Sequence, residues 1–282
     1  MPSLFRRVQF QNTRRGGNHG ITSIPCIIIS TLYRHRRNPS DETKKKIEEL
    51  IGALKDCQAE SGGWWYSSVH GGTSFMTAPA LIALLEAQHV GFKVAEPTLS
   101  KATEFLKKLR NDNGSFEYYL KKQQRGATPV ESCIRDPACE LALYLAGQSD
   151  ATKLKAALSN MLRHRAELEK ARREGIKWWA GEKGPPHGFA VFFGYFYAVQ
   201  ALHYLDPTAK MDAGNNQTLT PPQAIESIRR TLIGAQSEDG SWKSSDSNPG
   251  TYDSNTTMAL LALVDKKLLQ AEIIKRDDLQ PK

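Results

Sequence analysis

The chain has 282 residues, of which 40% are hydrophobic and 24% charged, and its formal net charge is +8 at pH 7. These values are typical of a globular protein and not of a disordered one. Seven of the 38 basic residues are arginines within residues 1–40, which hold no acidic residue, so 31 basic residues face 30 acidic ones in the rest. The positive charge therefore does not indicate a nucleic-acid-binding surface.

Residues 1–42 differ in composition from the rest of the chain. Residues 21–32 are apolar enough for the hydrophobic part of a secretion signal, but no small-x-small cleavage site follows and three arginines interrupt at residues 34–37. A disordered basic segment, or a poorly defined start of the reading frame, is the first interpretation; a signal or anchor is the alternative. The chain is expected in the cytoplasm by default and outside the cell if residues 21–32 are a signal.

Membrane spans and cysteine frameworks are excluded by simple counts. No run approaches the ~20 apolar residues that a membrane-spanning helix needs. Cys26, Cys57, Cys133 and Cys139 show no C-x-x-C spacing, so neither a disulfide scaffold nor a zinc ribbon is indicated.

The first recurring unit occupies residues 44–88. Residues 44–58 are amphipathic, which predicts a helix packed on one side. Residues 62–65 (GGWW) then predict a glycine turn with an aromatic residue folded over the helix end. Residues 75–88 (FMTAPALIALLEAQ) are apolar or small on nearly every side, which predicts an inner helix buried between neighbours.

The same unit recurs three times downstream. Each copy predicts an outer amphipathic helix, a Gly-aromatic turn and an inner apolar helix. The outer helices are predicted at residues 98–110, 151–174 and 225–236, the turns at 113–116, 178–188 and 239–242, and the inner helices at 138–147, 189–205 and 257–264. The chain therefore divides into the basic segment 1–42, a repeat domain at 43–265 and a charged tail at 266–282.

The turns carry a resemblance to a known family. Residues 236–242 (QSEDGSW) resemble the Q-x-x-x-G-x-W repeat of the prenyltransferase and squalene oxidase repeat family. Residues 58–64 match it again, and residues 113–116 match its glycine and aromatic positions. The family includes terpenoid cyclases and the beta subunits of protein prenyltransferases, so the resemblance implies an all-α fold, the alpha/alpha toroid. Four helix pairs are fewer than a complete ring of that family holds, which leaves an open ring or part of a longer protein as alternatives.

The beginnings of the inner helices would face the central cavity of such a ring. Aromatic and apolar residues gather there, and they would suit an isoprenoid or lipid chain. The alternative is that they form helix–helix core, because aromatic faces at helical spacing usually do. The candidate substrate-binding residues are Phe75, Met76, Phe192, Phe193, Tyr195 and Tyr252.

Three polar residues are candidates for catalysis in the same region, namely Asp136, His187 and Asp253. Class II terpene cyclases of the resembling superfamily protonate an alkene with a D-x-D-D cluster, and this chain has a single Asp136 beside Arg135. An adjacent cation lowers a carboxyl pKa, which opposes a role as a strong acid. Asp136 also precedes Pro137, a pattern typical of a helix N-cap. Enzyme status stays open; an enzyme here would be terpene-cyclase-like or prenyltransferase-like.

Zinc is the one cofactor that the resemblance raises. Protein prenyltransferases of this superfamily hold zinc with an aspartate, a cysteine and a histidine, for which this chain offers Asp136, Cys139 and His187. The family's aspartate and cysteine lie closer together in sequence than these, and Pro137 intervenes. We therefore predict no stoichiometric zinc and no other cofactor.

Two classes of function remain open. The chain could be an enzyme or carrier for an isoprenoid or lipid in the central cavity. The alternative is a non-catalytic toroid that binds a protein or peptide through its loops.

The basic segment yields a first testable prediction. Deleting residues 1–40 should leave helicity and melting temperature nearly unchanged, because the segment lacks the repeat pattern and carries unpaired like charge. Circular dichroism of the truncated and full chains checks this. Loss of the folded state on deletion would contradict it.

Overall fold

The computed structural model describes residues 40–65, 71–120, 127–174, 190–243 and 252–263. Within these ranges the chain is helical apart from one short antiparallel hairpin, which pairs β1 (Met211–Asp212) with β2 (Thr218–Leu219). None of the helices in these ranges has the length and apolar character needed to cross a bilayer. The predicted basic segment up to residue 39, the whole of the third turn and the charged tail lie outside the described residues.

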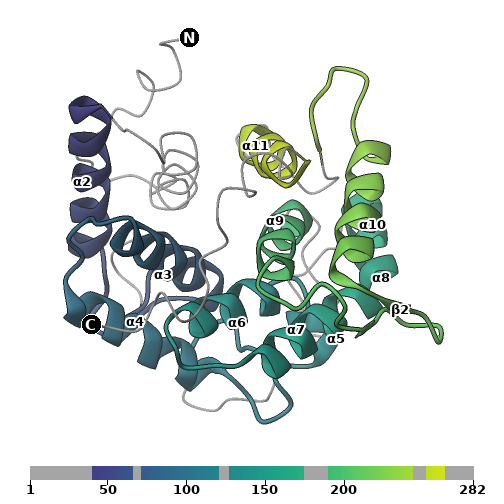
Figure 1. The fold of residues 1–282 in the computed structure, drawn as a ribbon, viewed down its shortest axis with the longest axis horizontal. Helices are drawn as coiled ribbons and strands as arrows, with labels where there is room; N and C mark the ends of the chain where they lie inside the picture. Colours follow the sequence, from purple (N-terminus) through teal and green to yellow (C-terminus); the bar gives the residue numbers. More distant parts are fainter. Residues whose placement is uncertain (1–39, 66–70, 121–126, 175–189, 244–251, 264–282) are drawn as a thin grey trace.

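Four outer helices follow the rim of an arc (Figure 1). They are amphipathic: in α2, for example, Ile47, Leu50, Ile51 and Leu54 are buried at helical spacing. The outer helices are α2 (Asp41–Asp56), α4 (Glu96–Leu109), α7 (Ala151–Arg163) and α10 (Pro221–Gly234).

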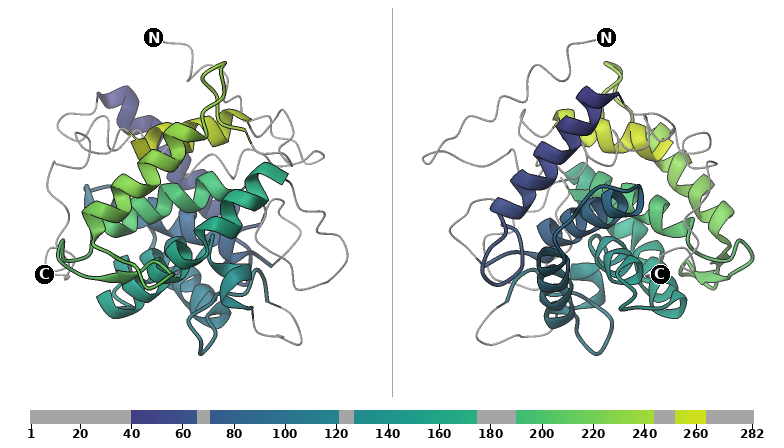
Figure 2. Two further views of the ribbon diagram at one scale, coloured as in Figure 1. Left: turned by 90° about the vertical axis from the view of Figure 1, so that its right-hand side faces the viewer. Right: turned by 60° about the vertical axis from the view of Figure 1, so that its left-hand side comes forward.

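Four inner helices lie within this arc and pack on one another in chain order. They are α3 (Ser74–His89), α6 (Asp136–Leu145), α9 (Val191–Leu202) and α11 (Tyr252–Leu263). All ten residues of α6 and all twelve of α9 are buried, as expected for a helix with neighbours on every side. Among the described residues the packing runs from α3 through α6 and α9 to α11 and does not return to α3, so the predicted all-α toroid is an open arc there. In Figure 2, α10 and α11 lie against α9.

The long charged helix predicted for residues 151–174 is wrong as a single element. It is two helices, α7 and α8 (Arg165–Glu174), which are separated at His164. Leu168 and Ala171 of α8 are buried, and α8 packs on α9.

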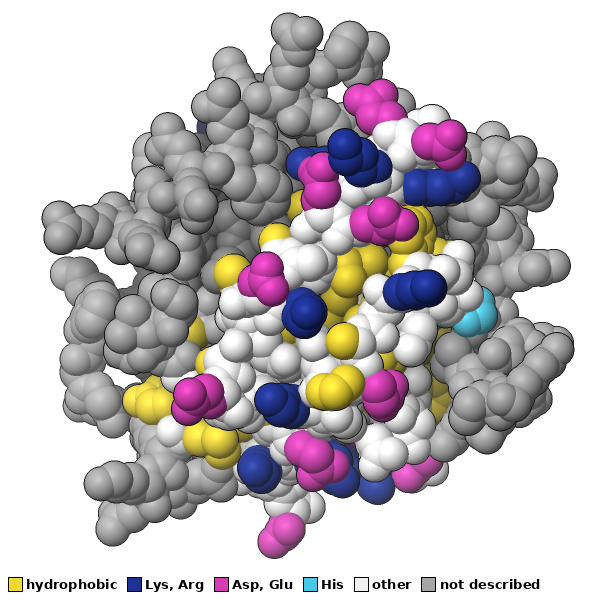
Figure 3. All heavy atoms as spheres, turned by 90° about the vertical axis from the view of Figure 1, so that its left-hand side faces the viewer, with side chains coloured by type: hydrophobic (Ala, Val, Ile, Leu, Met, Phe, Trp, Pro, Cys, Tyr) yellow, Lys and Arg dark blue, Asp and Glu magenta, His cyan; other side chains and the backbone are white. Residues whose placement is uncertain are grey.

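The convex face over α2 and α4 carries intermixed charges of both signs (Figure 3). Several are paired along the helices, with Lys44 3.1 Å from Asp41 and Lys107 2.7 Å from Glu104. This mixture agrees with the near-neutral balance of residues 41–282, and exposed pairs of this kind stabilise a helix only slightly.

The Gly-aromatic turns share one backbone hydrogen-bond pattern. The N–H groups of Ala59, Asn111 and Ser237 each donate to the carbonyl four residues later, at 3.0, 2.9 and 2.9 Å. The glycine of each turn has a positive φ, +93° at Gly62 and +78° at Gly240, a conformation that only glycine adopts without strain.

The aromatic residues of these turns are buried at equivalent positions, as their spacing predicts. Trp64, Phe116 and Trp242 are at most 1% exposed. The indole N–H of Trp64 donates to Leu54 O at 2.8 Å, and that of Trp242 donates to Leu232 O at 2.7 Å. Both indoles thus satisfy a carbonyl in the last turn of the preceding outer helix.

The tryptophan contacts give a second prediction. Trp64→Ala or Trp242→Ala should lower the free energy of unfolding by ~3 kcal/mol or more, because each leaves a large cavity and removes the indole hydrogen bond. Trp65→Ala is the matched control, since Trp65 is partly exposed beside Trp64. Chemical denaturation measures the three variants. Equal losses for Trp64 and Trp65 would contradict the docking of the turn aromatics.

Candidate functional site

Asp136 is the best-defined candidate of the predicted catalytic set. The prediction that it caps α6 is wrong: the helix begins at Asp136, and the N-cap position is Arg135. Its carboxylate accepts three hydrogen bonds from other parts of the chain, from Phe116 N–H at 3.1 Å, Ser132 Oγ–H at 2.7 Å and Asn160 Nδ2–H at 3.0 Å. Asp136 therefore joins the second turn, α5 (Pro129–Ser132) and α7.

The bond from Phe116 has counterparts in the two turns with tryptophan. Trp64 N–H donates to Thr77 Oγ1, and Trp242 N–H donates to Thr256 Oγ1, each at 3.1 Å. Thr77 and Thr256 lie in the first part of α3 and α11, as Asp136 does in α6. In each of these three turns, the backbone N–H of the buried aromatic residue therefore donates to a side-chain oxygen near the start of the next inner helix. We call this contact the turn clasp.

Arg135 binds the backbone carbonyl of the same residue, Phe116. Its guanidinium is buried and donates to Phe116 O from Nε at 3.0 Å and from Nη2 at 2.6 Å. Nη1 donates to Glu131 O at 2.8 Å. Arg135 and Asp136 together satisfy both polar groups of Phe116, which explains why this pair of opposite charges is tolerated in the core.

The environment of Asp136 sets its protonation. Burial raises the pKa of the Asp136 carboxyl to about 6, while the Arg135 guanidinium and the hydrogen bonds from Ser132, Asn160 and Phe116 lower it. At neutral pH the group is therefore mainly a carboxylate, which accepts its three hydrogen bonds and has no proton to donate.

The predicted substrate-binding residues divide between two sides of α9. Phe75 of α3 stacks on Phe193 with ring centroids 4.0 Å apart, and Tyr197 lies 4.7 Å from Phe193. Tyr195 instead donates its hydroxyl to Glu169 of α8 at 2.8 Å, which places it away from that stack. Phe75, Met76, Phe192, Phe193 and Tyr195 are all buried.

The other predicted site residues are not brought to Asp136 by the described part of the chain. His187 lies outside the described residues. Tyr252 and Asp253 belong to α11, but the structure does not describe their side chains. Cys139 is fully buried in α6, where its Sγ–H donates to Ser74 O at 3.8 Å and burial raises the pKa of its thiol. No three His, Cys, Asp or Glu side chains within the described ranges group as metal ligands, and the zinc expectation stays a prediction.

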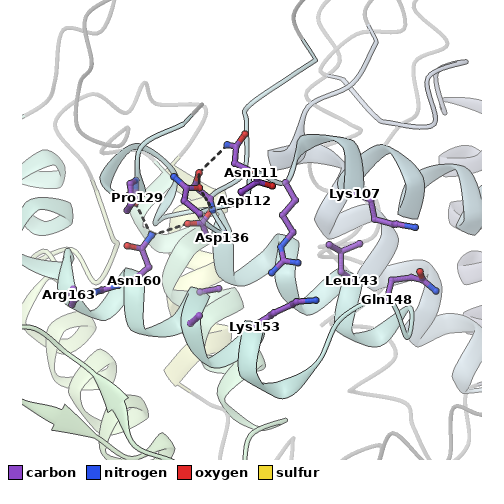
Figure 4. A pocket seen from close by; sticks show the side chains of 16 residues that line it. Lys107, Asn111, Asp112, Pro129, Asp136, Leu143, Gln148, Lys153, Asn160 and Arg163 are labelled. Atoms are coloured by element: carbon purple, nitrogen blue, oxygen red, sulfur yellow. Dashed lines mark hydrogen bonds between the residues drawn. The ribbon is translucent and has the colours of Figure 1, made fainter. Parts of the chain in front are cut away.

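A cavity of about 730 Å³ lies between α4, the second turn, α6 and α7. We call it the outer cavity. Figure 4 shows Pro129, Asp136 and Asn160 at one end, and Lys107, Gln148 and Lys153 at the other. The sequence analysis missed this site. Its signal was the face of α7 on which Lys153, Asn160 and Arg163 recur at helical spacing among small alanines.

Comparisons with known proteins give limited matches. No protein-family model matches the sequence, and no curated protein matches it. Among solved structures, the chain is similar to the type II terpene cyclase MstE from Scytonema without ligand, at 14% identity and a TM-score of 0.39, over 89% of this chain and 86% of that one. It is also similar to a variant of MstE in complex with the product merosterolic acid A, at 15% identity and a TM-score of 0.38, over 88% and 86% of the two chains.

The pKa of Asp136 gives a third prediction. An unfolded Asp has a pKa near 3.9, so between about pH 4 and pH 6 the native chain binds more protons than the unfolded chain. The contribution of Asp136 to the free energy of unfolding should therefore fall as pH rises through this window, by about 3 kcal/mol, and stay level above it. The difference between wild type and Asp136→Asn, measured by denaturation from pH 4 to 7, should show this fall.

Asp150→Asn is the matched control for that titration. Asp150 accepts from Lys153 N–H at 3.0 Å, and this hydrogen bond lowers the pKa of its exposed carboxyl. Its pH dependence should have the opposite sign, with stability lost as pH falls. A wild-type advantage over Asp136→Asn that grows with pH would contradict the raised pKa.

Proposed function

We propose that this chain is a binding domain whose inner helices receive an apolar chain, an isoprenoid or a lipid, without chemical change to it. The observation that supports this most is the stack of Phe75 on Phe193 at 4.0 Å. In the order of packing, α6 lies between the helices that carry these two rings. Their contact therefore spans two non-consecutive inner helices, as expected of side chains that point toward the inside of the arc.

The energies favour exchange of this stack for a ligand. An aromatic pair contributes about 0.5–1.5 kcal/mol beyond its buried area, whereas each buried methylene of a ligand contributes about 0.8 kcal/mol. An isoprenoid of several units would thus outweigh one ring–ring contact. The rings would then line the ligand instead of each other, in a site that is apolar as such sites usually are.

The non-catalytic part of the proposal rests on Asp136. Protonation of an alkene needs a carboxylic acid that is protonated and aimed at the substrate. The Asp136 carboxyl has a pKa of about 6 and accepts hydrogen bonds from three donors, one of them the backbone of the second turn. The Asp136 carboxyl supports the turn and is poorly placed to donate a proton to a substrate.

A second candidate function, binding of a protein or peptide, is favoured by apolar side chains on the surface. Ile233 of α10 is 62% exposed and Leu260 of α11 is 45% exposed, and these two helices pack on each other. Exposed apolar side chains on neighbouring helices suit contact with another protein better than contact with water. They do not explain the aromatic stack, so we favour the apolar ligand.

The proposal predicts that the purified chain binds farnesol or a longer isoprenoid alcohol and that the ligand is recovered with unchanged mass. Phe193→Leu should alter affinity about fivefold or more, because it removes the ring that meets Phe75. Phe105→Leu is the matched control: Phe105 is equally buried, but on the outer helix α4, so its loss should lower stability and leave affinity unchanged. Titration followed by native mass spectrometry measures both.

Failure of isoprenoid alcohols and of fatty acids to bind would contradict the apolar-ligand proposal. Recovery of a cyclised or transferred product would contradict its non-catalytic part.

A further inference from the structure

The outer cavity carries four cationic side chains, from α4, its C-terminal end and α7. Arg110 is the most enclosed of them, with a side chain that is 22% exposed. Its Nε forms an ion pair with Glu140 Oε2 at 3.1 Å, and neither of these two buried atoms makes a hydrogen bond to a described residue. A guanidinium held by one edge presents the other edge as a planar fork, which matches a carboxylate or phosphate.

Lys107 and Lys153 stand at the same end of the cavity in Figure 4. Lys107 pairs with Glu104 at 2.7 Å and Lys153 with Asp150 at 3.5 Å, and all four side chains are 43–57% exposed. Exposed ion pairs of this kind are weak. Both ammonium groups can therefore turn toward an anion in the cavity at little cost.

The opposite end of the cavity accepts hydrogen bonds. Asn160 is 8% exposed, and its Oδ1 is buried with no partner among the described residues. Its amide nitrogen is fixed by bonds to Pro129 O at 2.8 Å and Asp136 Oδ2 at 3.0 Å, so the direction of the oxygen is set. A buried acceptor without a donor is costly, and a ligand hydroxyl that displaces the atoms covering this oxygen would satisfy it.

Acidic groups near this end restrict where an anion can bind. Asp112 and Asp136 both line the cavity. Their charge disfavours an oxyanion beside Asn160 and favours hydroxyl donors there, where the cation Arg163 already pairs with Asp212 at 3.5 Å, while Lys107 and Lys153 favour the oxyanion away from Asn160. An oxyanion is therefore favoured near Lys107 and Lys153, and hydroxyl donors are favoured near Asn160.

We infer that the outer cavity binds a small polyhydroxylated acid, a sugar phosphate or a sugar acid, with its oxyanion on Arg110 and Lys153 and a hydroxyl donating to Asn160. Its volume of about 730 Å³ lies within the range of sites for small molecules. This site is separate from the inner aromatic stack, and the inference does not rest on the proposed binding of an apolar chain.

Isothermal titration calorimetry of the full chain tests the inference with four probes: glucose 6-phosphate, glucuronate, inorganic phosphate and glucose. At least one of the two charged sugars should bind, and it should bind more tightly than both phosphate and glucose, which each lack one half of the recognised chemistry. Comparison of glucose 6-phosphate with glucuronate identifies which oxyanion the cavity prefers.

Variants locate the site. Lys153→Ala should weaken binding about tenfold, the loss expected of one charge-assisted hydrogen bond. Lys155→Ala is the matched control, because Lys155 lies on the same helix and does not line the cavity. Arg110→Lys should also weaken binding, since it keeps a charge beside Glu140 and removes the fork.

Three results would overturn the inference. The first is no heat and no rise in melting temperature with either charged sugar at millimolar concentration. The second is unchanged affinity in a folded Lys153→Ala variant. The third is inorganic phosphate binding as tightly as glucose 6-phosphate, which would remove the role given to Asn160.

Discussion

A turn that enters the core between an outer and an inner helix carries a backbone N–H away from water. In three turns of this chain that N–H belongs to the buried aromatic residue, and a side-chain oxygen at the start of the next inner helix accepts it at 3.1 Å. A buried N–H without an acceptor costs free energy comparable to that of a lost hydrogen bond. In these three helix pairs the register between the outer and the inner helix therefore depends on the turn clasp, and the arc depends on that register.

The clasp of the second pair differs from the others in charge, and this difference connects fold and site. Threonine accepts this hydrogen bond at positions 77 and 256, but Asp136 accepts it in α6, where Arg135 also binds the carbonyl of Phe116. Asn160, which lines the outer cavity, ties the carboxylate to α7, and its own buried oxygen has no partner among the described residues. Asp136, the residue that resembled a catalytic acid, thus serves as the acceptor of a structural contact. Its partner Asn160 supplies the acceptor of the polar site that we infer.

Local patterns of residues predicted much of this architecture. Amphipathic and apolar periodicities placed the four outer and four inner helices, and glycine with an aromatic residue placed the three turns that the structure describes. The break at His164 was missed because α8 is charged like α7 and only two small apolar positions mark its buried side. Asp136 was misassigned as a cap because its partners, Phe116 and Asn160, are 20 and 24 residues away. The outer cavity joins Arg110, Asp136 and Lys153 from three segments, and no single segment shows such a site.

Amide hydrogen exchange of the full chain, followed residue by residue, tests the turn clasp most directly. The account predicts that the N–H groups of Trp64, Phe116 and Trp242 exchange as slowly as those of buried inner helices, since each is bonded in the core. In Asp136→Ala the exchange of Phe116 should accelerate far more than that of Trp242, whose acceptor is Thr256. Rapid exchange of all three in the wild type, or equal acceleration of Phe116 and Trp242 in the variant, would contradict the account.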